Sequence, residues 1–398
     1  MNAKNKTKIL KLDIGDSVSF LDGLDISVNL SIIIYLCTFL LPFLDTRLAI
    51  IIMSSMIFLS LSSRIFDLRI SHFLKGTKLE KINIFAILPF FYFFPMLVLE
   101  SYPILLSISI FCISRIMVGL FFSLSYRNLS INGNLQEVNL SSSKFWIFFF
   151  IGLGFGFFLF GVINEIYSND FLNQGGWKVL YLILIVVTLI LNFFTSYYFK
   201  KSIKFILKIK NEEGNKNDSQ KFFSIYFLIT LIPLTSFLFF ASSNWLPKFS
   251  NPENLYFLSY DFLYPFLTIL LIIFLNPLAN LVGRRKSIIF FNFSIILISF
   301  VSSFVDHNSS YSIDFFKLYI ALVSSFSICC FNLQSEYKRI SIQEILTKFN
   351  LVLFLFSIFT PFLFYYFIHA SINYSSIYIF FALVYVINYF TFFYQKNG

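Results

Sequence analysis

FCISRIMVGLFFSLSY, residues 111–126, places a single arginine, Arg115, inside an apolar run. An arginine keeps its proton at physiological pH, and a charge in hydrocarbon costs about 2.5–3.5 kcal/mol or more unless it meets protein, water or a counter-charge. The hydrophobic pattern places no other Lys or Arg deep within a long apolar segment. We therefore expect Arg115 to point into the interior of a bundle of membrane helices and to have an acidic partner.

The acidic partner is expected in the apolar segment nearest the N-terminus, FLDGLDISVN, residues 20–29. At about 1.5 Å per residue, Asp25 lies roughly 10 Å from the start of its helix, and Arg115, on a helix running the other way, reaches a similar depth. Asp22 precedes Asp25 by one turn and Asn29 follows it by one turn, so all three project from one helical face. This arrangement predicts a polar cavity around Asp25 and Arg115. A static pair that only joins two helices is the alternative.

The composition excludes a soluble protein. Of 398 residues, 58% are hydrophobic and only 13% are charged, whereas about a quarter of a soluble domain is charged. The net charge of +10 does not indicate nucleic-acid binding, because the basic residues fall in short segments between apolar runs, where they set membrane topology. The four cysteines lie in apolar segments without disulfide or metal-site spacing. We expect no cofactor and no nucleic-acid partner, and membrane lipids around the protein.

Apolar runs of about 20 residues, long enough to cross the hydrocarbon core, occur at twelve places. The expected spans are 17–42, 47–66, 82–99, 102–124, 145–165, 177–199, 222–243, 258–281, 286–305, 315–335, 347–369 and 375–394. With the N-terminus inside, the outer loops hold only four of the 30 Lys and Arg residues: Arg47, Lys178, Lys248 and Lys317. A shift by one span would reverse this bias. The positive-inside rule therefore predicts twelve transmembrane helices with both termini cytoplasmic.

A polar and basic connector divides these spans into six plus six, the equal halves typical of an internally duplicated transporter. The expected segments are a cytoplasmic N-terminal tail (1–16), an N-terminal six-helix bundle (17–199), a cytoplasmic linker (200–221), a C-terminal six-helix bundle (222–394) and a C-terminal tail (395–398). The predicted fold class is an all-α integral membrane protein.

The connector after the eighth expected span reads NPLANLVGRRKSII, residues 276–289. Gly283, Arg284, Arg285 and Lys286 resemble the end of the loop signature of the major facilitator superfamily, although Asn280 stands where that family has an aspartate. We expect Gly283 to allow a tight turn. The cations are expected to bind the ends of neighbouring helices, which would stabilise one access state.

Other stretches are most similar to the metabolite:proton symporter group of that superfamily, which includes proline/betaine and dicarboxylate carriers. LDGLDIS (21–27) resembles its first-helix acidic pair, and RIMVGLFFSLSY (115–126) resembles its fourth-helix arginine motif. GGWKVLYLI (175–183) resembles the run entering its sixth helix, and Glu336 stands at the inner end of the tenth expected span, as that group's glutamate does. The fourth-helix motif departs from the group at Val118, Ser123, Leu124 and Ser125.

The resemblance implies two six-helix bundles of the major facilitator type in the bacterial cytoplasmic (inner) membrane. It further implies a monomeric secondary transporter that uses protons to move a small zwitterion such as proline or betaine, or a small organic acid. The resemblance implies no enzymatic activity. Asp22, Asp25, Asn29 and Arg115 are the candidate substrate or proton site. The candidate residues for conformational gating are Gly283, Arg284, Arg285, Lys286 and Glu336.

Two alternatives remain open at this point. A lipid-linked oligosaccharide flippase or polysaccharide-export membrane protein also has about twelve spans and basic inner loops. A transporter-like protein that no longer transports would explain the altered fourth-helix motif. An enzyme is not expected, because the chain has no Gly-x-Ser-x-Gly, phosphate-loop or paired-histidine motif.

Four glycines crowd the fifth expected span: Gly152, Gly154, Gly156 and Gly161. Small residues let membrane helices approach closely. The pattern therefore predicts tight helix packing at this span, with a hinge as the alternative.

Overall fold

The computed structural model describes residues 14–66, 69–70, 84–98, 102–132, 143–199, 263–304, 312–338, 350–351, 353–355 and 374–394. All regular structure in these ranges is helical. The expected span at 222–243 and the linker at 200–221 lie outside the described residues, as does nearly all of the expected span at 347–369. Every other expected span coincides with a helix or a bent pair of helices.

The helices of the N-terminal half are α1 (Ile14–Ser31), α2 (Ile33–Leu40), α3 (Thr46–Ser62), α5 (Ile84–Met96), α6 (Ile104–Asn132), α7 (Ser143–Ile166), α8 (Asn169–Phe171) and α9 (Lys178–Phe199). A 3₁₀ turn, η1 (Ser63–Phe66), follows α3, and a π-type turn, η3 (Leu172–Gly176), precedes α9. The described helices of the C-terminal half are α12 (Leu263–Val282), α13 (Arg284–Ser302), α14 (Ser312–Lys338) and α16 (Tyr374–Tyr394).

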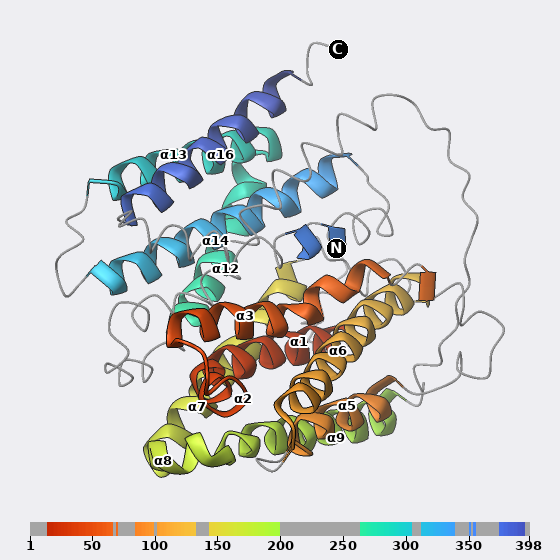
Figure 1. The fold of residues 1–398 in the computed structure, drawn as a ribbon. Coiled ribbons are helices and arrows are strands. Elements are labelled where there is room, and N and C mark those ends of the chain that lie inside the picture. Colours follow the sequence, from red (N-terminus) through yellow and green to blue (C-terminus); the bar gives the residue numbers. More distant parts are fainter. Residues whose placement is uncertain are drawn as a thin grey trace.

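The helices form two groups that meet along α7. In Figure 1, α5 and α9 lie side by side at one edge, and α13 and α16 lie side by side at the other. α7 packs along α1 within its own half and also contacts α12 and α14 of the other half. Nearly all described side chains of α1 are buried, so polar groups on this helix are enclosed by protein.

Several described helices suit a membrane. By length and composition, Leu48–Phe66, Ile104–Tyr126 and Lys144–Ile166 could each cross one, and the two bent pairs, α1 with α2 and α8–η3 with α9, raise the number to five. The other described apolar helices are shorter. Large apolar side chains are exposed on their outer faces, among them Leu105, Phe193 and Phe274, as expected where protein meets lipid. The count of twelve spans and the cytoplasmic placement of both termini stay predictions.

The expected span at 17–42 is a bent pair, because α1 and α2 meet at 55°. No proline or glycine stands at the bend, but the hydroxyls of two serines bond to carbonyls of the preceding turn: Ser27 to Leu24 at 3.0 Å and Ser31 to Ser27 at 2.8 Å. Such back-bonding weakens the regular ladder and bends helices. The bend directs α2 away from the axis of α1, toward η3.

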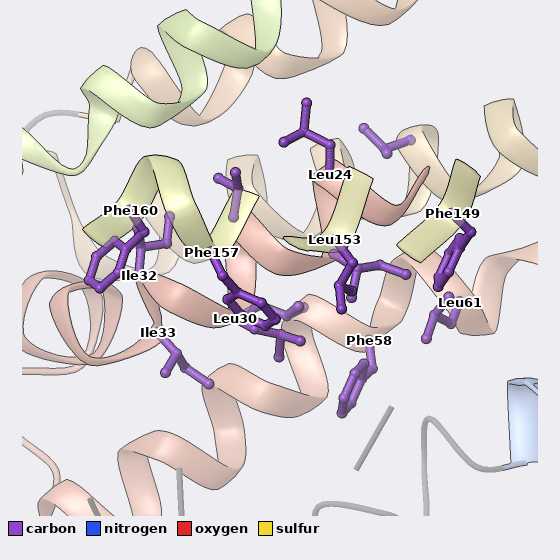
Figure 2. Packing of buried hydrophobic residues seen from close by; sticks show 14 of the residues in the cluster. Leu24, Leu30, Ile32, Ile33, Phe58, Leu61, Phe149, Leu153, Phe157 and Phe160 are labelled. Atoms are coloured by element: carbon purple, nitrogen blue, oxygen red, sulfur yellow. The ribbon is translucent and has the colours of Figure 1, made fainter. Parts of the chain in front are cut away.

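Glycines of α1 and α7 allow these two helices to approach closely. A Cβ added at Gly152 would lie 1.9 Å from the carbonyl oxygen of Phe20, and one at Gly23 would lie 2.0 Å from that of Phe149. Figure 2 shows the apolar side chains of this contact, with Leu24 of α1 beside Leu153 of α7. The predicted tight packing is confirmed for Gly152 and for Gly156, whose added Cβ would lie 1.9 Å from the Ser27 hydroxyl.

Replacing Gly152 with alanine is expected to lower stability by about 1–3 kcal/mol, because the methyl group has no room between α1 and α7. Gly161→Ala is the matched control, since a Cβ there meets nothing within 4 Å, and alanine favours the helix by up to about 1 kcal/mol. Thermal unfolding in detergent compares the two variants. Equal midpoints would contradict the close approach of the helices.

The connection between α12 and α13 is as tight as expected. Gly283 has φ +96°, a region that residues with a Cβ rarely adopt. The carbonyl of Ala279 near the end of α12 accepts hydrogen bonds from the Gly283 N–H at 3.1 Å and from the Ser287 hydroxyl at 3.1 Å. The helix end is thus capped by the glycine and a serine. The side chains of Arg284 and Arg285 lie outside the described residues, so their predicted contacts with helix ends stay a prediction.

The segment that joins the expected spans at 145–165 and 177–199 is helical. α7 continues to Ile166, and α8 and η3 carry the chain to α9. The hydroxyl of Tyr35 in α2 donates to the side-chain oxygens of Asn164 and Asn169, each at 3.0 Å. These hydrogen bonds join α2 to the end of α7 and to α8.

Candidate functional site

The predicted ion pair between Asp25 of α1 and Arg115 of α6 is present. The two terminal nitrogens of Arg115 donate to the two carboxylate oxygens of Asp25, at 2.8 and 2.6 Å. Arg115 is 0% and Asp25 1% exposed, so the pair is closed off from solvent in this conformation. A bidentate pair of this kind is the strongest arrangement available to the two side chains.

Asn29 extends this pair by one helical turn, as its spacing predicted. Its amide nitrogen donates to the carboxylate of Asp25 at 3.2 Å and to the backbone carbonyl of Asp25 at 2.7 Å. Its amide oxygen accepts a hydrogen bond from the hydroxyl of Tyr181 in α9, at 2.5 Å. Three predicted residues therefore lie together, and Tyr181 of α9 joins them through a contact that the sequence did not predict.

Asp22 does not share Arg115, because it has an arginine of its own. Arg64 in η1 donates to the carboxylate of Asp22 through both terminal nitrogens, at 2.9 and 2.5 Å, and the hydroxyl of Tyr126 in α6 donates to it at 2.8 Å. The Arg64 guanidinium also lies over the ring of Phe122, 5.7 Å from its centroid, which is within range of a cation–π contact.

The expectation that Arg115 is the one cation deep inside an apolar segment was wrong. Arg64 is 2% exposed, although it stands near the end of the expected span at 47–66. A signal was available in the charge balance, since two buried carboxylates one turn apart need two cations to remain neutral. Arg64 lies two residues before the end of that expected span, and in the 3₁₀ turn η1 its side chain binds Asp22.

α1 therefore contacts α7, η1, α6 and α9 through polar groups along its length. Asp16 pairs with Lys144 at 2.6 Å, and the hydroxyl of Ser19 donates to the carbonyl of Phe145 at 2.6 Å, both on α7. Asp22 and Asp25 then contact η1 and α6, and Asn29 contacts α9. The buried site consists of two neutral carboxylate–arginine pairs stacked along one helix.

Donor groups beside these pairs have no hydrogen-bond partner among the described residues. They are the hydroxyl of Tyr92 in α5 and the Nε groups of Arg64 and Arg115. Tyr92 is fully buried and its hydroxyl interacts electrostatically with Asp25 and Arg115. Buried donors are rarely left unpaired, so the site holds more hydrogen-bonding capacity than the described side chains use.

Comparison with known proteins finds similarity in structure. No protein-family model and no curated protein matches the sequence. The xylose transporter XylE from E. coli, in a partially occluded inward-open conformation, matches with a TM-score of 0.67 at 15% identity, over 94% of this chain and 96% of that chain. Another XylE structure is described as a major facilitator superfamily proton:xylose symporter.

Two further solved structures cover nearly the whole chain. The nucleoside transporter NupG matches with a TM-score of 0.58 at 14% identity, over 97% of this chain and 100% of that chain. A bacterial homologue of the iron transporter ferroportin, in an outward-facing state, matches with a TM-score of 0.54 at 12% identity, over 97% and 100%. This chain has the fold of the major facilitator superfamily.

In this facilitator fold, the Asp22–Arg64 pair is connected to the C-terminal half. The amide nitrogen of Asn350 donates to the hydroxyl of Ser123 in α6 at 2.8 Å, and that hydroxyl donates to the backbone carbonyl of Arg64 at 3.4 Å. Among the described residues, the hydrogen-bond partners of the Asp25–Arg115 pair lie within the N-terminal half. The two pairs thus differ in what they touch, which the sequence did not indicate.

The described part of the C-terminal half offers mainly neutral hydroxyl groups. Ser299 and Tyr319 share a hydrogen bond of 2.7 Å, and Ser327 and Tyr385 share a short one. Lys317 is its one buried charged side chain among the described residues, and its Nζ lies over the ring of Tyr264 at 5.7 Å.

The candidate gating residues of the facilitator loop lie apart from the two ion pairs. Gly283 forms the α12–α13 turn, and Lys286 is exposed at the start of α13. Glu336 lies within α14, but its side chain is outside the described residues, as are those of Arg284 and Arg285. Their gating role therefore stays a prediction.

Proposed function

We propose that this protein is a secondary transporter that moves a small metabolite across the bacterial inner membrane by alternating access, coupled to protons through Asp25. The observation that carries the proposal is the bidentate Asp25–Arg115 pair, buried within a fold whose solved examples are transporters. Ionisable groups inside membrane proteins are costly and are commonly found on substrate or proton pathways. The loop at Gly283–Lys286, with Glu336, is proposed to gate the cycle.

Charge balance favours a substrate that carries a carboxylate. Asp25 now occupies both terminal nitrogens of Arg115. A proton on Asp25 would weaken both bonds and leave the guanidinium available to another carboxylate. The site is then neutral with either occupant: ionised Asp25 on Arg115, or protonated Asp25 beside Arg115 and a substrate carboxylate. This exchange suits a small zwitterion such as proline or betaine, or a small organic acid.

The two alternatives are less well supported. The structural neighbours favour a facilitator-type carrier over a flippase of lipid-linked oligosaccharides. Two complete bidentate pairs, both buried, favour an active carrier over one that no longer transports, because burying charge is costly and nothing in a purely structural role requires two such pairs in one helix.

Uptake into proteoliposomes tests the proposal. Labelled proline, betaine, succinate, xylose and uridine are offered under an imposed pH gradient, acidic outside. Saturable uptake of proline, betaine or succinate that increases with the gradient is expected. Uptake of xylose or uridine alone would overturn the proposed substrate class. Movement of a lipid-linked oligosaccharide as the sole activity would favour the flippase.

Replacing Asp25 with asparagine is expected to uncouple transport. The amide cannot take up a proton, so substrate accumulation should lose its dependence on the pH gradient while counterflow exchange stays measurable. Asp16→Asn is the matched control on the same helix, because Asp16 pairs with Lys144 rather than with either arginine. Active uptake by Asp25→Asn with its pH dependence intact would place the coupling site elsewhere.

A further inference from the structure

The amide of Asn29 stands between a carboxylate and a hydroxyl, and its orientation matters for both. Its nitrogen faces Asp25 as a donor, and its oxygen faces Tyr181 as an acceptor. A side-chain amide can turn over and exchange these roles. With its nitrogen toward Asp25 it favours the ionised carboxylate, whereas with its oxygen toward Asp25 it can only accept from a protonated carboxyl.

Tyr181 holds the amide in the first orientation. Its hydroxyl donates to the Asn29 oxygen at 2.5 Å, and Arg115 lies in electrostatic contact with the same hydroxyl. A cation attracts the hydroxyl oxygen and so leaves the hydroxyl proton directed at Asn29. The amide nitrogen also donates to the backbone carbonyl of Asp25 at 2.7 Å, a second hydrogen bond that keeps the amide in this orientation.

The charged and titratable groups that face Asp25 come from five elements. They are Arg115 on α6, Tyr92 on α5, Tyr181 on α9, Arg64 on η1 and Asp22 on α1 itself. α7 also packs along α1, and its described titratable side chains, Lys144 and Glu165, stand at its two ends. Tyr181 differs from Tyr92 because its hydroxyl reaches Asp25 through the side chain of Asn29, which is hydrogen-bonded to both.

We propose that Tyr181 is a positioning residue that acts through Asn29 to hold Asp25 in its ionised form. Loading a proton onto Asp25 then weakens the hydrogen bond from the Asn29 amide, because a neutral carboxyl is a poorer acceptor than a carboxylate. The inference rests on the proposed role of Asp25 as the group that exchanges a proton. Tyr181 contributes by fixing the donor that faces the carboxylate, without touching the carboxylate itself.

Infrared titration of the purified protein in proteoliposomes tests this without any substrate. The carbonyl stretch of a protonated carboxyl appears as Asp25 takes up a proton, and its absence from Asp25→Asn assigns the band. Tyr181→Phe removes the hydroxyl and keeps the ring, so Asp25 should take up its proton at a pH about one unit higher than in the unmodified protein, a tenfold change in proton affinity. Asn29→Leu, which removes the donor itself, should shift the midpoint in the same direction.

Tyr319→Phe is the matched control, because its buried hydroxyl bonds to Ser299 in the other half of the protein. Its midpoint should be unchanged. An equal midpoint in Tyr181→Phe and the unmodified protein, or no band in either down to the lowest pH at which both stay folded, overturns the inference. A shifted midpoint in a protein that transports none of the offered solutes would refute the proposed function and leave the role of Tyr181 standing.

Discussion

Replacing Arg115 with alanine is expected to cost about 3–5 kcal/mol of folding stability and to abolish uptake. The side chain is fully buried, and both of its terminal nitrogens are bound to Asp25. Removing it strands an ionised carboxylate beside two neutral groups, the amide of Asn29 and the hydroxyl of Tyr92. Asp25→Ala should be similarly damaging, because it strands the guanidinium instead.

The double variant separates the pair from the packing around it. Removing both charges leaves no stranded ion, so Asp25→Ala with Arg115→Ala should fold better than either single variant, while remaining inactive. Thermal unfolding in detergent and uptake into proteoliposomes measure the two effects. If the double variant loses as much stability as the two single variants together, the two side chains do not stabilise each other.

Replacing Arg64 with alanine is expected to be as destabilising as Arg115→Ala, at about 3–5 kcal/mol. Asp22 would keep only the Tyr126 hydroxyl as a partner. Arg69, five residues further on, is exposed and provides the control, because Arg69→Ala should change stability by no more than about 0.5 kcal/mol. Arg64→Lys should recover part of the loss, since an ammonium keeps the charge but cannot bind both carboxylate oxygens in the same way. Equal stability of the Arg64→Ala and Arg69→Ala variants would contradict the buried pair.

Hydrophobic length predicted the helices well, because any segment that crosses hydrocarbon must satisfy its backbone internally and therefore be helical. The bend between α1 and α2 was not predicted. The hydroxyls of Ser27 and Ser31 bond to backbone carbonyls just before it, and a hydropathy pattern does not show which serines bond in this way. The segment between α7 and α9 is likewise held by hydrogen bonds from the Tyr35 side chain. Hydropathy alone does not predict these bonds.

The site could be predicted where a charged or polar residue stands inside an apolar segment. Arg115, Asp25 and Asn29 stood out for that reason. Arg64 did not, because it lies at the margin between an apolar span and a basic connector, where a cation is ordinarily solvated. Tyr181 and Tyr126 were hidden for a different reason. The chain has 22 tyrosines, and only the three-dimensional packing reveals which hydroxyls reach the carboxylates.

The partners of α1 also bear on how the chain enters a membrane. Arg64 follows Asp22 by 42 residues, and Arg115 follows Asp25 by 90, so both carboxylates leave the ribosome before the cations that neutralise them. An unpaired Asp at the centre of a membrane helix costs about 2.5–3.5 kcal/mol on the translocon insertion scale. α1 is therefore a poor membrane segment by itself, and its stable insertion depends on α3 and α6 arriving beside it. The helices of this half must integrate as a group, with α1 retained near the translocon until Arg115 has been synthesised.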